Sequence, residues 1–339
     1  MKKIKLLFFV LIFYTLVNFI FSFYLKISLW GFEDYGSQKV LSNSIIDFSN
    51  SDLNFSVASH IYEDLSSFDS LNIFAVNNKL NASFILGDVG NYLNDKMNEK
   101  KYDLPYDLIL IPGNNDISND KEYYNFVESW GNYRAIQKKN ALFLLLNSME
   151  CTENFYPHEG CWFSQAQLDF LQKQILKSNS SVDHIFIFTH HIYWWKNLNI
   201  FSRLKLSRYA ELPINDIFEK FRRGELRAGI TRLIKKILFF GKGVIFARND
   251  YISKNNWTLI HNQLKSIDKN IFVIGGDAPF NSHIEKDKVH YLSTGFVSFD
   301  WNQNLNKPKE FFNIKIKGNN FQIINEEFFY RSKHYHDNN

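Results

Sequence analysis

Two short apolar runs that each end in a polar cluster constrain the fold of this chain more than any other feature. The first run leads into Gly87-Asp88, and the second leads into Gly113-Asn114-Asn115-Asp116. Such runs indicate buried parallel strands, and ligands bind at the carboxyl ends of strands of this kind. We therefore expect Asp88, Asn114 and Asp116 to converge on one rim of a sheet. The alternative for each cluster is a turn or a helix cap, where Asp and Asn are also common.

A third apolar run, Ile185–Thr189, ends in the pair His190-His191. The Gly-Asp cluster, the Gly-Asn-x-Asp cluster about 25 residues later and this His pair together resemble the calcineurin-like metallophosphoesterases. The resemblance covers roughly Asn54 to Ile324. It implies an α/β fold in which two β-sheets form a sandwich flanked by helices.

The resemblance also implies a set of metal ligands. In that family two metal ions share a bridging Asp, which here is Asp88. One ion would keep His60 and Asp88, and the other would keep Asp88, Asn114 and His190. Three ligands and an open position suit a catalytic zinc ion, whereas two ligands are too few for a stable one.

Two of the family's ligand motifs are incomplete in this chain. Ala58 stands where the family has a carboxylate before His60, and Gly275-Gly276-Asp277-Ala278 stands where it has Gly-His-x-His. Asp277 is a possible substitute ligand there. The resemblance therefore implies one divalent transition metal ion (Zn, Mn or Fe) rather than two, and a site without metal is the alternative.

Asn115 and Asp116 are the candidate catalytic residues. The family has a His near the leaving group at the position of Asn115, and an amide can hydrogen-bond a phosphate but cannot give up a proton. Losing a general acid costs on the order of 100- to 10,000-fold in rate. Two functions stay open: a hydrolase of weakened activity on an extracytoplasmic phosphate ester, or an inactive module for binding or assembly at a membrane.

The N-terminus predicts a membrane anchor. Residues Leu6–Leu25 carry no charge over a length that spans a bilayer, and they follow Lys2, Lys3 and Lys5. No small-residue cleavage site follows, so we expect a single uncleaved transmembrane helix, with residues 1–5 cytoplasmic and the main domain outside. Residues 26–53 would form a stalk, 54–326 the phosphoesterase domain and 327–339 a tail.

Residues 196–248 form a basic insertion within the predicted domain. They contain 13 Lys or Arg and 4 Asp or Glu, a balance of +9, whereas the whole chain of 339 residues is only +4. Residues 226–240 have helical spacing of apolar positions and could lie on an anionic membrane; a lid that packs on the domain is the alternative. The mild total charge and the lack of a basic-aromatic pattern predict no nucleic-acid partner.

Cys151 and Cys161 are the two cysteines of the chain. Outside the cytosol, a pair that closes a loop of about ten residues is expected to form a disulfide. Two unpaired thiols are the alternative, and the spacing does not favour a zinc pair.

Helices and strands alternate along the predicted domain. We expect a helix within Glu63–Lys79 that buries Leu65, Phe68, Leu71 and Phe74, and a helix capped by Ser164 that buries Leu168, Leu171, Ile175 and Leu176. Paired strands are expected at 133–136 with 141–146, and at 312–316 with 321–324.

Overall fold

The computed structural model describes a defined part of the chain. The described residues are 33–34, 40–62, 64–101, 103–117, 120–150, 163–178, 180–192, 260–276, 281–295 and 309–328. Nearly all of them belong to one compact unit, formed by Asp34–Lys196 and Lys242–Asn339. The expected anchor, the basic insertion, the cysteine pair, Asp277 and most of the expected tail lie outside the described residues. Among the described residues, no helix combines the length and the apolar character that a membrane span needs.

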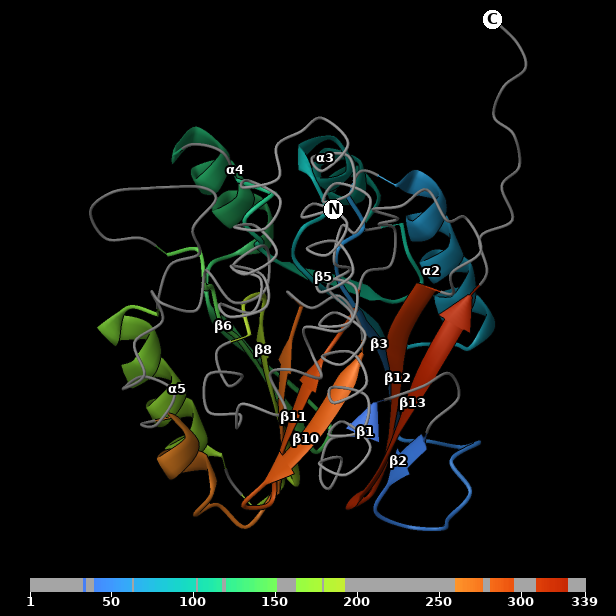
Figure 1. Cartoon of the computed structure of the whole chain (residues 1–339), viewed down its shortest axis with the longest axis vertical. Coiled ribbons are helices and arrows are strands. Elements are labelled where there is room, and N and C mark those ends of the chain that lie inside the picture. Colours follow the sequence, from blue (N-terminus) through green and yellow to red (C-terminus); the bar gives the residue numbers. More distant parts are fainter. Residues whose placement is uncertain are drawn as a thin grey trace, which may run out of the picture. The chain divides into compact units, whose positions relative to one another are not determined.

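Within residues 53–189, the described helices and strands alternate as expected, apart from one pair of consecutive strands (Figure 1). The helices are α2 (Leu65–Asn77), α3 (Asn91–Lys100), α4 (Asp120–Trp130) and α5 (Gln165–Lys177). The strands are β1 (Glu33–Asp34), β2 (Val40–Ser42), β3 (Leu53–Ala58), β4 (Ala82–Leu86), β5 (Asp107–Ile111), β6 (Arg134–Lys138), β7 (Ala141–Leu145), β8 (His184–Thr189), β9 (Asn270–Gly275), β10 (Ser282–Lys286), β11 (Val289–Ser293), β12 (Lys309–Lys317) and β13 (Asn320–Phe328).

These strands form two mixed sheets. The seven-stranded sheet has the order β1-β10-β11-β9-β8-β7-β6, and the six-stranded sheet has the order β2-β13-β12-β3-β4-β5. Strands β7, β8, β9 and β11 are parallel neighbours in the first sheet, as are β3, β4 and β5 in the second. The carboxyl ends of the parallel strands of each sheet therefore share an edge. The expected pairs β6–β7 and β12–β13 are confirmed as antiparallel.

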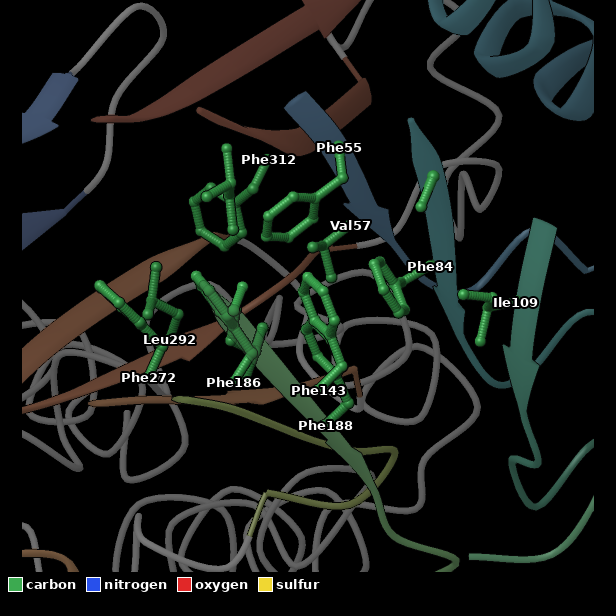
Figure 2. Packing of buried hydrophobic residues seen from close by; sticks show 14 of the residues in the cluster. Phe55, Val57, Phe84, Ile109, Phe143, Phe186, Phe188, Phe272, Leu292 and Phe312 are labelled. Atoms are coloured by element: carbon green, nitrogen blue, oxygen red, sulfur yellow. The ribbon is translucent and has the colours of Figure 1, made fainter. Parts of the chain in front are cut away.

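The core lies between the two sheets and is rich in phenylalanine. Alternate residues of a strand point to opposite faces, so Phe55 on β3 and Phe143 and Phe186 on the other sheet all point inward. The ring of Phe55 meets the rings of Phe143 and Phe186 edge to face, with centroids 5.2 and 5.1 Å apart (Figure 2). This geometry is favoured for aromatic pairs. The expected two-sheet sandwich is thereby confirmed.

Helices cover the outer faces of the sheets, with α2 beside the six-stranded sheet and α5 beside the seven-stranded sheet (Figure 1). Helix α2 starts at Leu65 because the Asp64 carboxylate accepts hydrogen bonds from the amides of Ser66 and Ser67. It buries Phe68 and Leu71, with Phe74 partly buried.

Leu168 is only partly buried, and two positions that we expected to be buried are exposed. Leu65 is 40% exposed and Leu176 is 78% exposed. Leu65 occupies the first position of its helix, and Leu176 follows Ile175, which takes the buried position in the last turn of α5. Adjacent helical residues point about 100° apart, so both cannot face the sheet.

The six-stranded sheet also begins earlier in the chain than expected. Val40–Ser42 lie in the segment that we expected to be a stalk, but they form β2 and pair with Gln322–Ile324 of β13. Asp52 also joins the domain, because its amide donates to the carbonyl of Ile316. The domain therefore includes residues before Asn54.

Candidate metal centre

Four strand ends from the two sheets meet at one site. His60 follows β3, Asp88 follows β4 and Asn114 follows β5 in the six-stranded sheet, while His190 follows β8 in the seven-stranded sheet. All four residues are at most 2% exposed. The site therefore joins the sheets at the edge where the parallel strands end, as the sequence predicts.

The side chains of these residues point at one another. His60 Nε2 lies 3.3 Å from Asp88 Oδ2, and His190 Nε2 lies 3.4 Å from Asp88 Oδ1. Asn114 Oδ1 lies 3.2 Å from the same nitrogen of His190. The ligand atoms of His60, Asp88 and His190 all fall within 4.8 Å of one another, and they form the one such group among the described residues.

Hydrogen bonds on the far side of each imidazole determine which nitrogen faces the cluster. His190 Nδ1 donates to the carbonyl of Leu86 over 2.7 Å. The Ser59 hydroxyl donates to the carbonyl of Gly276, so it accepts from His60 Nδ1, which lies 2.9 Å away. Each Nδ1 therefore carries a proton, and each Nε2 turns toward Asp88. Ligating histidines are commonly held in this way.

A cation fits this donor set. Two imidazole nitrogens, the Asp88 carboxylate and the Asn114 carbonyl converge, and such acceptors repel one another unless a proton or a metal ion lies among them. Asn114 Nδ2 is buried and has no hydrogen-bond partner among the described residues. Nitrogen and carboxylate ligands in this number suit a divalent transition metal ion.

The backbone of the site departs from the usual conformations. His60, Tyr62 and Asp88 have φ angles of 54°, 46° and 59°. The other described non-glycine residues with positive φ lie in turns or just after a helix. Left-handed backbone costs roughly 1–3 kcal/mol per residue and clusters at functional sites. The strain here brings two strand ends together, because the amide of Tyr62 donates to the carbonyl of Asp88.

The Asp88 carboxylate has further partners that sequence patterns did not reveal. Tyr62 Oη donates to Oδ2 over 3.0 Å, and Asn115 Nδ2 donates to the same oxygen over 2.6 Å. The backbone amide of Asn115 donates to Oδ1 over 2.9 Å. In the sequence, the one feature that points to a role for Tyr62 is its position two residues after the candidate ligand His60. The Asn115 side chain thus holds Asp88.

The charge of Asp88 follows from its neighbours. Burial acts to raise the pKa of this carboxyl, but His190 and the hydrogen-bonded His60 outweigh burial and hold the pKa well below its usual range. Asp88 is therefore ionised, as a metal ligand must be.

Asp116 ties the two loops together and does not face the cluster. Its oxygens accept hydrogen bonds from the amides of Asp88, Val89, Gly90 and Gly113, at 2.6 to 2.8 Å. Burial and the charge of Asp88 raise the pKa of Asp116 to about 6, although the amide donors favour the charged form. These contacts give Asp116 a positioning role.

The two histidines of the predicted pair have different surroundings. His190 joins the cluster, whereas the Nδ1 of His191 lies 2.8 Å from the hydroxyl of Ser148. Asp277, the possible substitute ligand, lies outside the described residues.

Comparison of structures, unlike comparison of sequences, reveals similarity between this chain and known proteins. No protein-family model matches the chain, and no curated protein matches its sequence. A dimetal phosphatase from Danio rerio is similar in structure, with a TM-score of 0.50 and 10% identity over 82% of this chain and 98% of that chain. At this identity the likeness shows the fold alone: the chain has a metallophosphoesterase fold.

Two further solved structures are similar at lower scores. GAP50, described as the anchor in the inner membrane complex of Plasmodium, has a TM-score of 0.46 and 10% identity, over 81% of this chain and 84% of that chain. TT1561 of Thermus thermophilus has a TM-score of 0.44 and 10% identity, over 80% of this chain and 98% of that chain.

Proposed function

We propose that this chain, which has a metallophosphoesterase fold, is a metal-dependent hydrolase of phosphate esters with weakened activity. The observation that carries the proposal is the convergence of two imidazole nitrogens and a carboxylate at the edge shared by both sheets. A divalent ion held there would act as a Lewis acid on a phosphoryl oxygen.

The chain's own residues would hold and orient that ion. Asp88, Asn114 and His190 supply three donors, and His60 Nε2 is a fourth within reach. Leu86 and Ser59 fix the two rings through their Nδ1 atoms. Zinc, manganese and iron all accept ligands of these kinds.

The weakened activity follows from Asn115. Its side chain donates to Asp88 and has no proton to give to a leaving group. Proton donation typically contributes on the order of 100- to 10,000-fold to the rate, so an alkyl ester should turn over slowly.

Hydrolysis by matched variants tests this function. We expect the metal-loaded chain to hydrolyse p-nitrophenyl phosphate or bis(p-nitrophenyl) phosphate. Asp88→Asn should lose more than the roughly 10- to 100-fold that a neighbour of a ligand costs. Asp107→Asn is the control, because Asp107 is an exposed residue at the other end of β5 that pairs with Lys138. Equal rates in the two variants would refute the function.

An inactive binding or assembly module is the second candidate. The observation that favours it is the set of hydrogen-bond donors around Asp88. Tyr62 and Asn115 fill most of the acceptor positions of this carboxylate without a metal ion. A wild-type chain that takes up no metal and hydrolyses neither ester would support this candidate.

The proposal includes a location. The charge-free segment Leu6–Leu25 behind three lysines supports a single-pass anchor with the domain outside the cytoplasm. The basic segment 226–240 would add contact with the membrane surface. Release of the chain from membranes by alkaline carbonate would refute the anchor. In an oxidising compartment we also expect a Cys151–Cys161 disulfide, and two free thiols in the unfolded, unreduced chain would exclude it.

A further inference from the structure

We propose that Tyr62 and Asn115 are positioning residues of the metal centre, which hold Asp88 by Oδ2 and leave Oδ1 as its metal-binding oxygen. The inference rests on the proposed function, because it concerns the metal that this function requires. It adds a role for Tyr62, which no sequence motif marks, and a new role for Asn115.

The lone pairs of the Asp88 carboxylate are unequally used. An ionised carboxylate has about four acceptor positions, two on each oxygen. Oδ2 receives Asn115 Nδ2 at 2.6 Å and Tyr62 Oη at 3.0 Å, which fill both of its positions, and His60 Nε2 lies farther from it, at 3.3 Å. Oδ1 receives the Asn115 amide at 2.9 Å, which leaves one position.

The remaining position of Oδ1 lies on the side of the other donors. His190 Nε2 is 3.4 Å from Oδ1, and Asn114 Oδ1 is 3.2 Å from that nitrogen. Two well-placed hydrogen bonds at Oδ2 prevent the carboxylate from rotating about its Cβ–Cγ bond. Asp88 therefore presents one oxygen, in one orientation, to a single metal ion.

Tyr62 reaches Asp88 from a strained backbone conformation. Tyr62 is an aromatic residue with a φ of 46°, where bulky side chains are rarely found. Its ring packs beside His60, with centroids 5.2 Å apart, and its hydroxyl lies 3.5 Å from Asn115 Nδ2. Tyr62 is half-buried, whereas the ligands are buried.

Metal affinity tests the proposal without any assay of activity. The full chain and the variants Tyr62→Phe, Asn115→Ala and the double variant are titrated with Zn²⁺ against a chelator of known affinity. We expect one ion per chain in the wild type. Each single variant should bind it about 10- to 100-fold more weakly, as for other groups that orient ligands. The double variant should deviate from additivity, because both groups hold one oxygen.

Tyr106→Phe is the matched control. It also removes a tyrosine hydroxyl that donates a hydrogen bond, to Asn72 Oδ1 at 3.1 Å, but in the packing between α2 and the sheet. Zn²⁺ affinity should be unchanged in this variant. Urea denaturation of each metal-free variant separates a loss of folding from a loss of orientation.

The possible failures are distinguishable. Unchanged affinity in Tyr62→Phe and Asn115→Ala, beside a wild type that binds Zn²⁺, overturns the inference alone. Tighter binding or a second ion in the double variant also overturns it, because the two residues would then compete with metal. A wild type that binds no Zn²⁺ overturns the proposed function and this inference together.

Discussion

Gly113 lets Asp88 and His190 approach each other. A Cβ atom on Gly113 would lie 2.4 Å from Asp88 Oδ1 and 2.9 Å from His190 Cε1. These distances are too short for any Cβ, so a larger residue would displace one of the two ligands. The glycine is therefore required by the metal site.

We expect Gly113→Ala to weaken Zn²⁺ binding sharply and to destabilise the domain by about 1–3 kcal/mol through overpacking. Gly318→Ala is the control. Gly318 has a φ of +54° but has no atom within 4 Å of an added Cβ. It should lose stability through backbone strain and bind Zn²⁺ normally. Chelator titration and urea denaturation measure both effects, and normal Zn²⁺ binding by Gly113→Ala would contradict this account.

Asp116 shows what residue patterns leave out. Its place in the second polar cluster made it a candidate catalytic residue, yet its carboxylate accepts amides from both loops. The sequence predicts that the two loops meet. It does not predict which carboxylate turns inward, because that depends on the directions of backbone N–H groups.

Asp116→Asn should destabilise the domain by roughly 1–3 kcal/mol, because an amide NH₂ would face backbone N–H groups and leave buried donors unsatisfied. Asp107→Asn removes an exposed ion pair with Lys138 and should cost about 0–1 kcal/mol. Urea denaturation compares the two variants. Similar midpoints would show that Asp116 does not hold the loops together.

At the scale of elements, the β12–β13 turn links the two sheets at the edge opposite the metal centre. His184 Nε2 donates to the carbonyl of Gly318 over 2.9 Å, and Asn140 Nδ2 donates to the same oxygen. Asn270 Nδ2 lies 3.4 Å from His184 Nδ1. Because an amide NH₂ group donates, Nδ1 accepts this hydrogen bond, and the neutral His184 ring carries its proton on Nε2. Burial lowers the pKa of His184, although the Gly318 contact and Asp183 act in the opposite direction.

This link predicts a loss of stability in acid. Below the ordinary His pKa of about 6.5, unfolded chains bind a proton that His184 in the folded domain resists. Stability from His184 is therefore present above about pH 6.5 and is lost as the pH falls. Urea midpoints of the chelator-treated wild type should fall more steeply below this pH than those of His184→Gln, which keeps a donor for Gly318. Parallel curves would reject the prediction.

Elements were predictable where their pattern is local. The core strands are apolar runs, and helices α2 and α5 have apolar spacing, so these elements and their order follow from the sequence. Strand β2 was missed because a three-residue strand has no pattern of its own and exists through pairing with β13. The predicted burial of Leu176 is wrong, because spacing alone does not say which of two adjacent apolar residues meets the sheet.

At the scale of the whole molecule, the site depends on two sheets that meet at one edge. The strand ends on each sheet were predictable from the polar clusters that follow apolar runs. The approach of His190 to Asp88 across the sandwich was expected from family resemblance, because no local rule relates the ends of strands in different sheets. The roles of Tyr62 and Ser59 became visible in the hydrogen bonds alone.

Metal content tests the central claim most directly. The full chain and its Asp88→Asn variant are stripped with a chelator, reloaded with Zn²⁺, Mn²⁺ or Fe²⁺, desalted and analysed for metal. The account predicts one ion per wild-type chain and none in Asp88→Asn, because Asp88 is the one carboxylate in the His60–Asp88–His190 group. No metal in the wild type, or equal content in both chains, would contradict the account.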